Sequence, residues 1–457
     1  MKAIALEITQ GRSASVMPTI RPYLSHAAML PHYSWLLGTD VWVAWVDDET
    51  DSSAFVGGDI LNVEGTVNHI FYAMPPFAEA TRPGLGDLPP EDIAELLKPF
   101  AENVDVASLL PFGSETLSLG PGASLDDLAM DGKWNQTLNM IQAPQAWEKS
   151  QGGNSIIAVL DSGIDGSRFD ERQLAGAWSD NMVVENPLDD TVGHGTMTSM
   201  LAVANPAVQG FAGVAPQAKL FVLNPMPGPT KVISTAGIMM GHDYILGVAR
   251  QMNKRIIVSN SWGIFGCKPI FLPCRIIETR ALVAMDKLGL CLHTWAVGNN
   301  HLENCGTQVE SWCMNTTPTS VAAGAMTLSG QRQGYSAIGG QCYPLTPTVA
   351  TPTEGVLPWG DGFRDFGRQG GGTSACAPQV AGALAILDTL YPTATNAQLR
   401  AALRSGAKQI GPDPQHNLGI GAGMLQIDDA ITALPSAENH WSYAYEKTFL
   451  ESKSTLV

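Results

Sequence analysis

Three residues of the chain carry the side chains that nucleophilic catalysis by serine needs. Asp161 follows an apolar run, His194 stands between glycines in the word GHGT, and Ser374 stands in GGTSACAP. A serine hydroxyl is a weak nucleophile near neutral pH. It needs a neutral imidazole that takes its proton and a carboxylate that orients this imidazole. We therefore predict Ser374 as the nucleophile, His194 as the general base and Asp161 as the orienting acid.

The sequence also offers donors for the oxyanion that acyl transfer creates. Asn299 follows an apolar run that ends at Gly298, and Ser374 opens a predicted helix, whose first N–H groups favour negative charge. The Asn299 side-chain amide and the Ser374 backbone N–H are therefore the predicted oxyanion donors. Asn300 is the alternative to Asn299, and the Gly-Asn order favours Asn299.

These motifs, in the order Asp, His, Asn, Ser, resemble those of the subtilisin-like serine proteases, or subtilases. VLDSGID is similar to the family's aspartate motif, GHGT to its histidine motif and GGTSACAP to its serine motif. The resemblance extends from about Trp134 to Leu434. It implies a serine endopeptidase that hydrolyses peptide or protein substrates through an acyl-enzyme intermediate.

The resemblance also implies where a substrate lies. The segment SNSWG is similar to the family's substrate-binding strand, on which an extended peptide adds a further strand. The predicted substrate-binding residues are Ser259, Asn260, Ser261, Trp262 and Gly263, together with Trp295, Ala296, Val297 and Gly298. Asp189 and Asp190 allow two interpretations, a solvated loop or a subsite for a basic substrate residue.

A calcium site is a further implication of the resemblance, and no cofactor is otherwise expected. Asp170 fits the position of an acidic ligand that well-studied bacterial members use shortly after the catalytic aspartate. The loop at 205–210 fits in length, but Ala207 stands where an Asn ligand is expected. Calcium needs six to eight oxygen ligands, so only Asp170 is named as a candidate.

Apolar runs alternate with helical segments from about Trp134 onward, which predicts a buried parallel sheet with helices on both faces. We expect a subtilisin-like three-layer α/β fold with a mainly parallel central sheet, preceded by a small α+β N-terminal domain. The expected strands are Ile156–Leu160, Leu220–Leu223, Ile256–Ser259, Leu290–Val297 and Ser320–Ala325. The expected helices are Thr196–Ala204, Thr235–Asn253, Arg275–Leu288 and Ser374–Leu390.

The predicted boundaries divide the chain into residues 1–125, a peptidase domain at 126–434 and a tail at 435–457. In the first part, Val41–Val46 predicts a strand, Pro89–Phe100 a helix and Leu119–Ser124 a linker. This part has two interpretations. It is an inhibitory, folding-assisting prodomain that is removed, or an accessory domain that stays attached. It precedes the segment Trp134–Trp147, which resembles the mature N-terminal segment of subtilases, and this position favours the prodomain.

Composition excludes several function classes. The chain has 26 Lys+Arg against 43 Asp+Glu, a net charge of −17, which argues against nucleic acid and anionic membranes as partners. Hydrophobic residues make up 45%, enough for a large core. No apolar run is long enough for a transmembrane helix. The N-terminal sequence lacks a signal-peptide pattern, so we expect a cytoplasmic protein or export by another route.

The seven cysteines suggest little chemistry. Cys267 with Cys274, and Cys305 with Cys313, do not match zinc spacings and would each close a local disulfide or stay free. Cys376 lies two residues after Ser374, and we expect it to pack in the core rather than act as a nucleophile.

Two other functions stay open at this level. An amine could intercept the acyl-enzyme, which would make the protein a peptide-maturing ligase or macrocyclase. The chain could also be a non-catalytic regulatory protein on a protease fold, although the intact Asp-His-Ser set argues against it.

Overall fold

The computed structural model describes thirteen stretches of the chain: residues 2–47, 49–50, 55, 57–65, 68–71, 133–179, 186–225, 232–263, 276–299, 319–338, 348–353, 371–410 and 419–436. The predicted helix Pro89–Phe100, the predicted linker Leu119–Ser124 and the boundary at 125/126 lie outside these residues. So do Cys267, Cys274, Cys305 and Cys313, and all but the first two residues of the tail.

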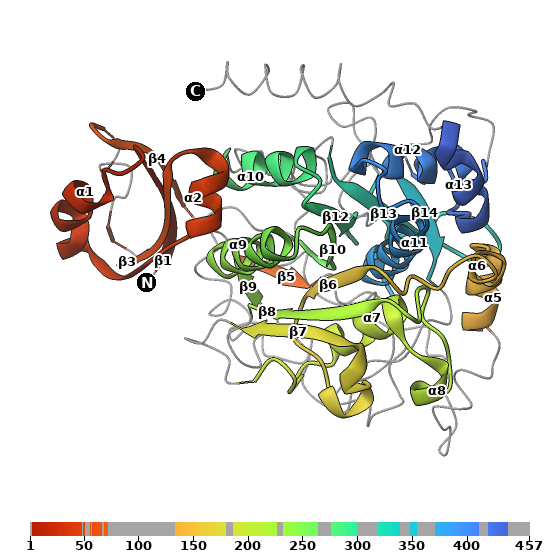
Figure 1. Cartoon of the computed structure of the whole chain (residues 1–457). Helices are drawn as coiled ribbons and strands as arrows, with labels where there is room; N and C mark the ends of the chain where they lie inside the picture. The colour runs from red at the N-terminus through yellow and green to blue at the C-terminus, as the bar shows by residue number, and fades with distance from the viewer. Residues whose placement is uncertain are drawn as a thin grey trace.

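A seven-stranded parallel sheet forms the centre of the molecule, in the order β14-β13-β12-β10-β6-β8-β7 (Figure 1). Its strands are β6 (Ile156–Leu160), β7 (Leu174–Ser179), β8 (Lys219–Asn224), β10 (Ile256–Asn260), β12 (Cys291–Ala296), β13 (Val321–Met326) and β14 (Val349–Pro352). Every residue of β6, β10, β12 and β13 is buried, as continuous apolar strands covered on both faces require. All five predicted strands are confirmed.

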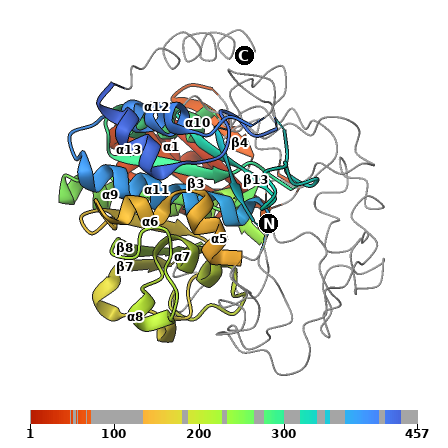
Figure 2. The ribbon, with the colours of Figure 1, turned by 90° about the vertical axis from the view of Figure 1, so that its right-hand side faces the viewer.

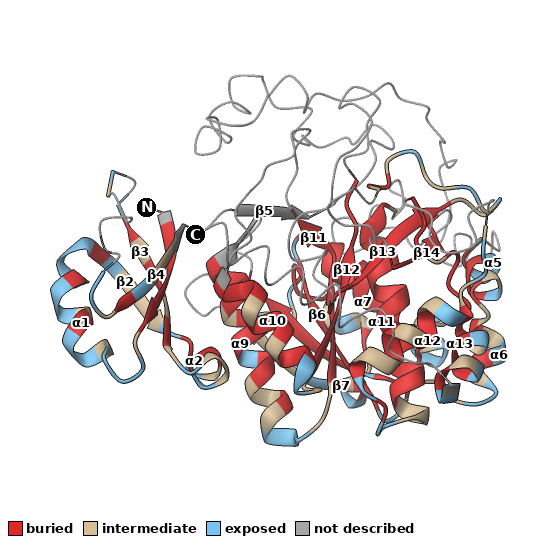
Figure 3. Cartoon of the chain, turned by 90° about the horizontal axis from the view of Figure 1, so that it is seen from above, coloured by how far each residue is buried: buried red, intermediate tan, exposed pale blue. Residues whose placement is uncertain are grey.

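Helices cover both faces of this sheet, with α9 and α10 on one side and α7 and α11 on the other (Figures 1 and 3). Further short helices surround them, and α13 packs on α12 and on α6 (Figure 2). Their bounds are α5 (Lys133–Met140), α6 (Ala143–Trp147), α7 (His194–Val203), α8 (Pro206–Gln209), α9 (Thr235–Met252), α10 (Ile276–Lys287), α11 (Cys376–Leu390), α12 (Asn396–Gly406) and α13 (Ile427–Ala433). The three-layer α/β prediction is therefore confirmed.

Helix α11 is the central helix of the domain. Its residues from Cys376 to Asp388 are all buried, and it packs across β6, β10, β12 and β13 (Figure 3). The predicted helix began at Ser374, but Thr373–Ala375 form a 3₁₀ turn ahead of α11. The nucleophile candidate thus stands in a tight turn at the amino end of a buried helix.

A small α+β domain precedes the sheet, as predicted. Its antiparallel sheet has the order β2-β3-β1-β4, and the predicted strand at Val41–Val46 is β3. The bounds are β1 (Lys2–Ile8), α1 (Ser13–Ile20), β2 (Leu24–Met29), α2 (Pro31–Leu37), β3 (Asp40–Val46) and β4 (Ile60–Gly65). Helix α2 packs against α9 and α10, and Leu30 and Tyr33 join the same buried cluster as the central sheet.

One further strand links the N-terminal part to the part that contains the central sheet. β5 (Asn68–Phe71) lies antiparallel between β11 (Trp262–Gly263) and β9 (Val232–Ser234). Figure 1 shows β5 next to the larger sheet, separated from the rest of the N-terminal domain. The sequence did not predict this pairing, which joins the N-terminal segment to the predicted substrate-binding strand.

Across the described stretches, none of the helices is both long and apolar enough to cross a lipid bilayer.

The packing of α11 sets the first test. A Cβ added at Gly382 would lie 2.6 Å from the Cβ of Val214, which is too close. We expect Gly382→Ala to lower the free energy of unfolding by about 1–3 kcal/mol, a typical cost of overpacking. Urea unfolding in a Ser374→Ala background, which removes the predicted nucleophile, measures it. Ser405→Ala, on the exposed side of α12, is the control and should change stability by less than about 0.5 kcal/mol. Equal values for the two variants would contradict the packing.

Candidate active site

Asp161 and His194 form a buried pair at the carboxyl end of β6. His194 Nδ1 lies 2.8 Å from Asp161 Oδ1 and 3.0 Å from Oδ2, and each side chain is only 1% exposed. The carboxylate also accepts hydrogen bonds from the backbone N–H of Ser162 and the hydroxyl of Thr198. With Nδ1–H donating to Asp161, the ring presents Nε2 on its opposite side.

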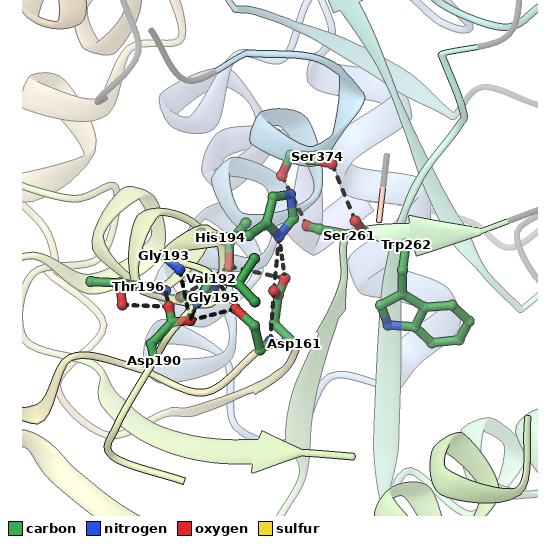
Figure 4. A network of polar contacts seen from close by, with 12 residues as sticks. Asp161, Asp190, Val192, Gly193, His194, Gly195, Thr196, Ser261, Trp262 and Ser374 are labelled. Atoms are coloured by element: carbon green, nitrogen blue, oxygen red, sulfur yellow. Dashed lines mark hydrogen bonds and ion pairs between the residues drawn. The ribbon is translucent and has the colours of Figure 1, made fainter. Parts of the chain in front are cut away.

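Ser374 lies beyond the far side of this imidazole. Figure 4 shows the His194 ring between the Asp161 carboxylate and the Ser374 side chain. The Ser374 hydroxyl donates to the carbonyl of Ser261 at 3.1 Å, and the Ser261 hydroxyl donates to the carbonyl of Ser374 at 2.9 Å. The three predicted catalytic residues, far apart in sequence, therefore meet beside the predicted substrate-binding strand.

The close approach of α7 to β6 depends on a glycine. A Cβ at Gly195 would collide with the backbone carbonyl of Gly163 and lie 3.1 Å from the Cβ of Asp161. The glycine after His194 in GHGT is thus needed to bring the imidazole onto the carboxylate.

Asp190 holds the loop that leads into His194, a role that the sequence did not reveal. Its carboxylate accepts backbone N–H bonds from Val192, Gly193 and Thr196, and hydroxyl bonds from Ser162 and Thr196 (Figure 4). Burial raises the pKa of this carboxyl, and these hydrogen bonds oppose the rise. Asp190 is only 6% exposed, so both the solvated-loop and the basic-subsite interpretations are wrong for it.

Asn299 is fixed by the residue that precedes the candidate nucleophile. Its Oδ1 accepts from the backbone N–H and from the hydroxyl of Thr373, each at 2.8 Å. The N–H of Gly298 donates to the same Thr373 hydroxyl at 3.1 Å. Because Oδ1 is engaged by Thr373, the donor that Asn299 can offer to an oxyanion is Nδ2.

The predicted substrate-binding residues lie together along two neighbouring strand ends. Ser259, Asn260 and Ser261 are buried at the end of β10, and Trp295, Ala296 and Val297 at the end of β12. The backbone of β11 pairs with β5. The Trp262 indole is fully buried, donates to the carbonyl of Leu160 at 3.1 Å and packs edge-to-face on Trp295. Because its side chain is buried, Trp262 contributes its backbone to the predicted substrate-binding surface.

Arg172 engages the Asp170 carboxylate in the part of the chain that the structure describes. This carboxylate accepts from the backbone and the guanidinium of Arg172, and these bonds lower its pKa to about 2. The Asn205 side-chain oxygen accepts from the N–H of Ala207, and that of Gln209 from the N–H of Asn205. Among the residues that the structure describes, no three His, Cys, Asp or Glu gather as metal ligands. Calcium at Asp170 stays a prediction.

Cys376 is not a rival nucleophile. It is fully buried, and burial raises the pKa of its thiol to about 12, so it stays protonated near neutral pH. The core position predicted for Cys376 is confirmed.

A parallel α/β sheet that carries a buried Asp–His pair beside a serine at a helix start has the architecture of a serine hydrolase. Residues 152–423, more than half of the chain, match the model of the subtilase family. The chain therefore belongs to the subtilase family and is a subtilisin-like serine peptidase.

Individual relatives agree with this assignment. The chain is 28% identical over 298 residues to subtilisin NAT of Bacillus subtilis subsp. natto and, equally, to subtilisin E of Bacillus subtilis (strain 168). Each alignment covers 64% of this chain and 70% of the relative. The crystal structure of fervidolysin from Fervidobacterium pennivorans superposes with a TM-score of 0.61 and 18% identity. That superposition covers 94% of this chain and 61% of fervidolysin, and it supports the fold.

The Asp190 network predicts a large effect for a small substitution. Asp190→Asn places an amide NH₂ against a ring of N–H and O–H donors, so we expect at least one unsatisfied buried donor and a loss of about 1–3 kcal/mol in unfolding free energy. The neighbouring Asp189 is exposed, so Asp189→Asn is the matched control and should stay within about 0.5 kcal/mol. Chemical unfolding of both in the Ser374→Ala background compares them. An Asp190→Asn protein as stable as its control would refute the positioning role.

Proposed function

We propose that the protein is a serine endopeptidase in which Asp161, His194 and Ser374 form the catalytic triad. The observation that carries this proposal is the His194 ring, held by two contacts to the buried Asp161 carboxylate and lying between it and Ser374 (Figure 4). His194 Nε2 takes the proton of the Ser374 hydroxyl as Oγ attacks the peptide carbonyl carbon. Asp161 holds the tautomer and stabilises the imidazolium that forms.

The oxyanion formed by this attack is bound by Asn299 Nδ2 and the backbone N–H of Ser374. His194 then protonates the leaving amine, which departs and leaves an ester on Ser374 Oγ. A water molecule, deprotonated by His194, hydrolyses this ester and restores the enzyme. The anchoring of Asn299 on Thr373 supports its role, because it ties the donor to the turn that carries the nucleophile.

Loss of triad members sets the test of this mechanism. We expect Ser374→Ala to abolish hydrolysis of a fluorogenic peptide. We expect Asp161→Asn to lower kcat by about 10⁴-fold, because the amide stabilises the wrong imidazole tautomer. Asp165→Asn is a control: this carboxylate ties its own turn through Ser167 and Arg168 and does not contact His194. Substantial kcat in the Asp161→Asn or Ser374→Ala enzyme would refute the triad.

We further propose that residues 1–125 act as an intramolecular inhibitor of this site. Extended peptides bind such sites by adding a strand, and β5 does this on β11 through Phe71–Trp262 and Ile70–Gly263 pairs. β9 pairs with the other edge of β5, so the strand lies between two strands of the peptidase part. A substrate would have to displace it.

The register of β5 also indicates where self-processing would occur. Trp262 pairs with Phe71, and the next residue toward the nucleophile is Ser261, whose carbonyl accepts from Ser374. Phe71, the last described residue of β5, therefore lies one position of the antiparallel register away from Ser261. We therefore expect cleavage at the bonds just after Phe71.

Intact-mass measurement of the purified protein tests this expectation. We expect an N-terminal fragment that ends within a few residues of Phe71 in the wild type and an uncleaved chain in Ser374→Ala. An uncleaved wild-type chain with full peptidase activity would refute the inhibitory role and favour a permanent accessory domain.

The runner-up is a peptide ligase or macrocyclase, in which an amine attacks the same ester on Ser374. It needs water kept away from the leaving-group side, and no contact among the described residues favours that over hydrolysis. The same peptide assay separates the two, because transfer forms a new amide and hydrolysis a free carboxylate.

A further inference from the structure

A buried chain of polar side chains runs from the N-terminal domain to the substrate-binding strand. The Tyr33 hydroxyl on α2 donates to Glu278 Oε2 on α10 at 2.9 Å. Glu278 Oε1 lies 2.6 Å from His242 Nδ1 on α9, and His242 Nε2 lies 3.2 Å from Asn260 Oδ1 at the end of β10. All four residues are 0% exposed. None of the four residues belongs to the proposed triad, so the triad does not account for this chain of hydrogen bonds.

The orientation of Asn260 determines how many protons the chain holds. Its Nδ2 donates to the backbone carbonyls of Val258 and Thr294, so Oδ1 is the atom that faces His242. Oδ1 only accepts, and His242 Nε2 must therefore carry a proton. A second proton lies between His242 Nδ1 and Glu278 Oε1, because two acceptors cannot share a 2.6 Å contact. The Glu278–His242 pair is thus neutral overall, which burial requires.

The inner end of the chain reaches the catalytic serine. Asn260 is followed directly by Ser261, which exchanges two hydrogen bonds with Ser374, and by Trp262, which pairs with β5. The ring of His242 lies 6.4 Å from the Trp262 indole. A shift of the Asn260 side chain would therefore move the backbone that holds the substrate.

The outer end of the chain depends on docking of the N-terminal domain. The backbone N–H of Tyr33 donates to Asp243 Oδ1 at 2.6 Å, which fixes the start of α2 on α9. Arg280 on α10 pairs with Glu7 of β1 at 2.8 Å in the same interface, but it is 38% exposed and contacts no member of the chain. Only the Tyr33 hydroxyl supplies a donor to Glu278 from the N-terminal domain among the described contacts.

We propose that Glu278, His242 and Asn260 are positioning residues for the strand Ser261–Gly263, and that the Tyr33 hydroxyl completes their hydrogen-bond chain when the N-terminal domain is docked. Docking on α9 and α10 and binding of a peptide on β11 are then coupled. Without the Tyr33 donor, Glu278 Oε2 is a buried acceptor with no partner. Glu278 then shifts to find one, and this shift changes the hydrogen bonds of His242 and, through them, the position of Asn260. The inference rests on the proposed function only in taking β11 as the substrate-binding strand.

Hydrogen exchange of the full chain in the Ser374→Ala background tests this coupling, since that protein stays intact. The variants are Tyr33→Phe, which deletes one oxygen, His242→Leu, which breaks the chain, and Glu278→Gln, which preserves it. In Glu278→Gln the amide oxygen accepts from Tyr33, the amide NH₂ donates to His242 Nδ1, and His242 Nε2–H still reaches Asn260. Arg280→Ala is the control: it removes a partly exposed ion pair of the same interface and leaves the Tyr33 contacts with Asp243 and Glu278 in place.

Backbone amides at Trp262 and Gly263 should exchange about three- to tenfold faster in Tyr33→Phe and His242→Leu, as expected for the loss of about one net hydrogen bond. Glu278→Gln and Arg280→Ala should stay within about twofold of the parent, and β13 should be unchanged in all four. Unchanged exchange at Trp262 in Tyr33→Phe would overturn the proposal. If His242→Leu does not fold, Tyr33→Phe alone is sufficient for this test. An effect of Glu278→Gln as large as that of His242→Leu would also overturn it.

The active chain supplies the second readout. In the catalytic protein, His242→Leu should raise KM for an extended peptide and Glu278→Gln should not, while a small fluorophosphonate, which does not pair with β11, labels both at the parent rate. Absence of labelling in the parent would instead count against the proposed peptidase function, so the two failures are distinguishable.

Discussion

The hydrogen bond between Asp161 and His194 is the interaction on which the arrangement of this molecule depends. Both side chains are almost fully excluded from water, and the buried carboxylate also accepts hydrogen bonds from the Ser162 N–H and the Thr198 hydroxyl. The His194 imidazole reaches this carboxylate because α7 begins against the end of β6. Gly195 leaves room for this close approach, and the hydrogen bonds of Asp190 hold the start of α7 in place. The Asp190 carboxylate, in the loop before α7, thus holds the His194 ring in place.

The serine side of the site is assembled by different elements that converge on the same point. The turn before α11 presents Ser374, β10 presents Ser261, and the end of β12 presents Asn299 through Thr373. The same β10 strand carries Asn260, whose contacts lead outward between α9 and α10 to the N-terminal domain. The proposed active site and the surface that packs against the N-terminal domain are therefore parts of one packed core. Burial raises the pKa of Asp243, which accepts from the Tyr33 N–H at this interface, to about 7. The folded state therefore loses stability as pH rises from about 4 through 7.

The sequence predicted the central sheet and the Asp, His and Ser positions because these depend on short, local patterns. Continuous apolar runs mark buried strands, and the residue that follows each run lies at the functional edge of a parallel sheet. The structure brings Asp161, His194 and Ser374 together in the way these patterns predict. The calcium prediction at Asp170 remains untested.

What the sequence could not predict depends on contacts between distant segments. Nothing in the four residues of β5 distinguishes a strand that pairs with β11 from an ordinary loop, and nothing near Tyr33 predicts Glu278 as its partner. Asp190 resembles a solvated loop acid until its five donors are assembled around it. In each case the burial that gives the residue its role is created by tertiary structure.

In the proposed mechanism, the buried Asp161–His194 pair activates one particular serine, Ser374. Peptide mapping of the processed wild-type protein after reaction with a fluorophosphonate identifies the activated residue. We expect a single adduct, on Ser374, that is lost in Ser374→Ala and formed far more slowly in Asp161→Asn. A folded, processed protein that carries no adduct, or an adduct on a different serine, would contradict it.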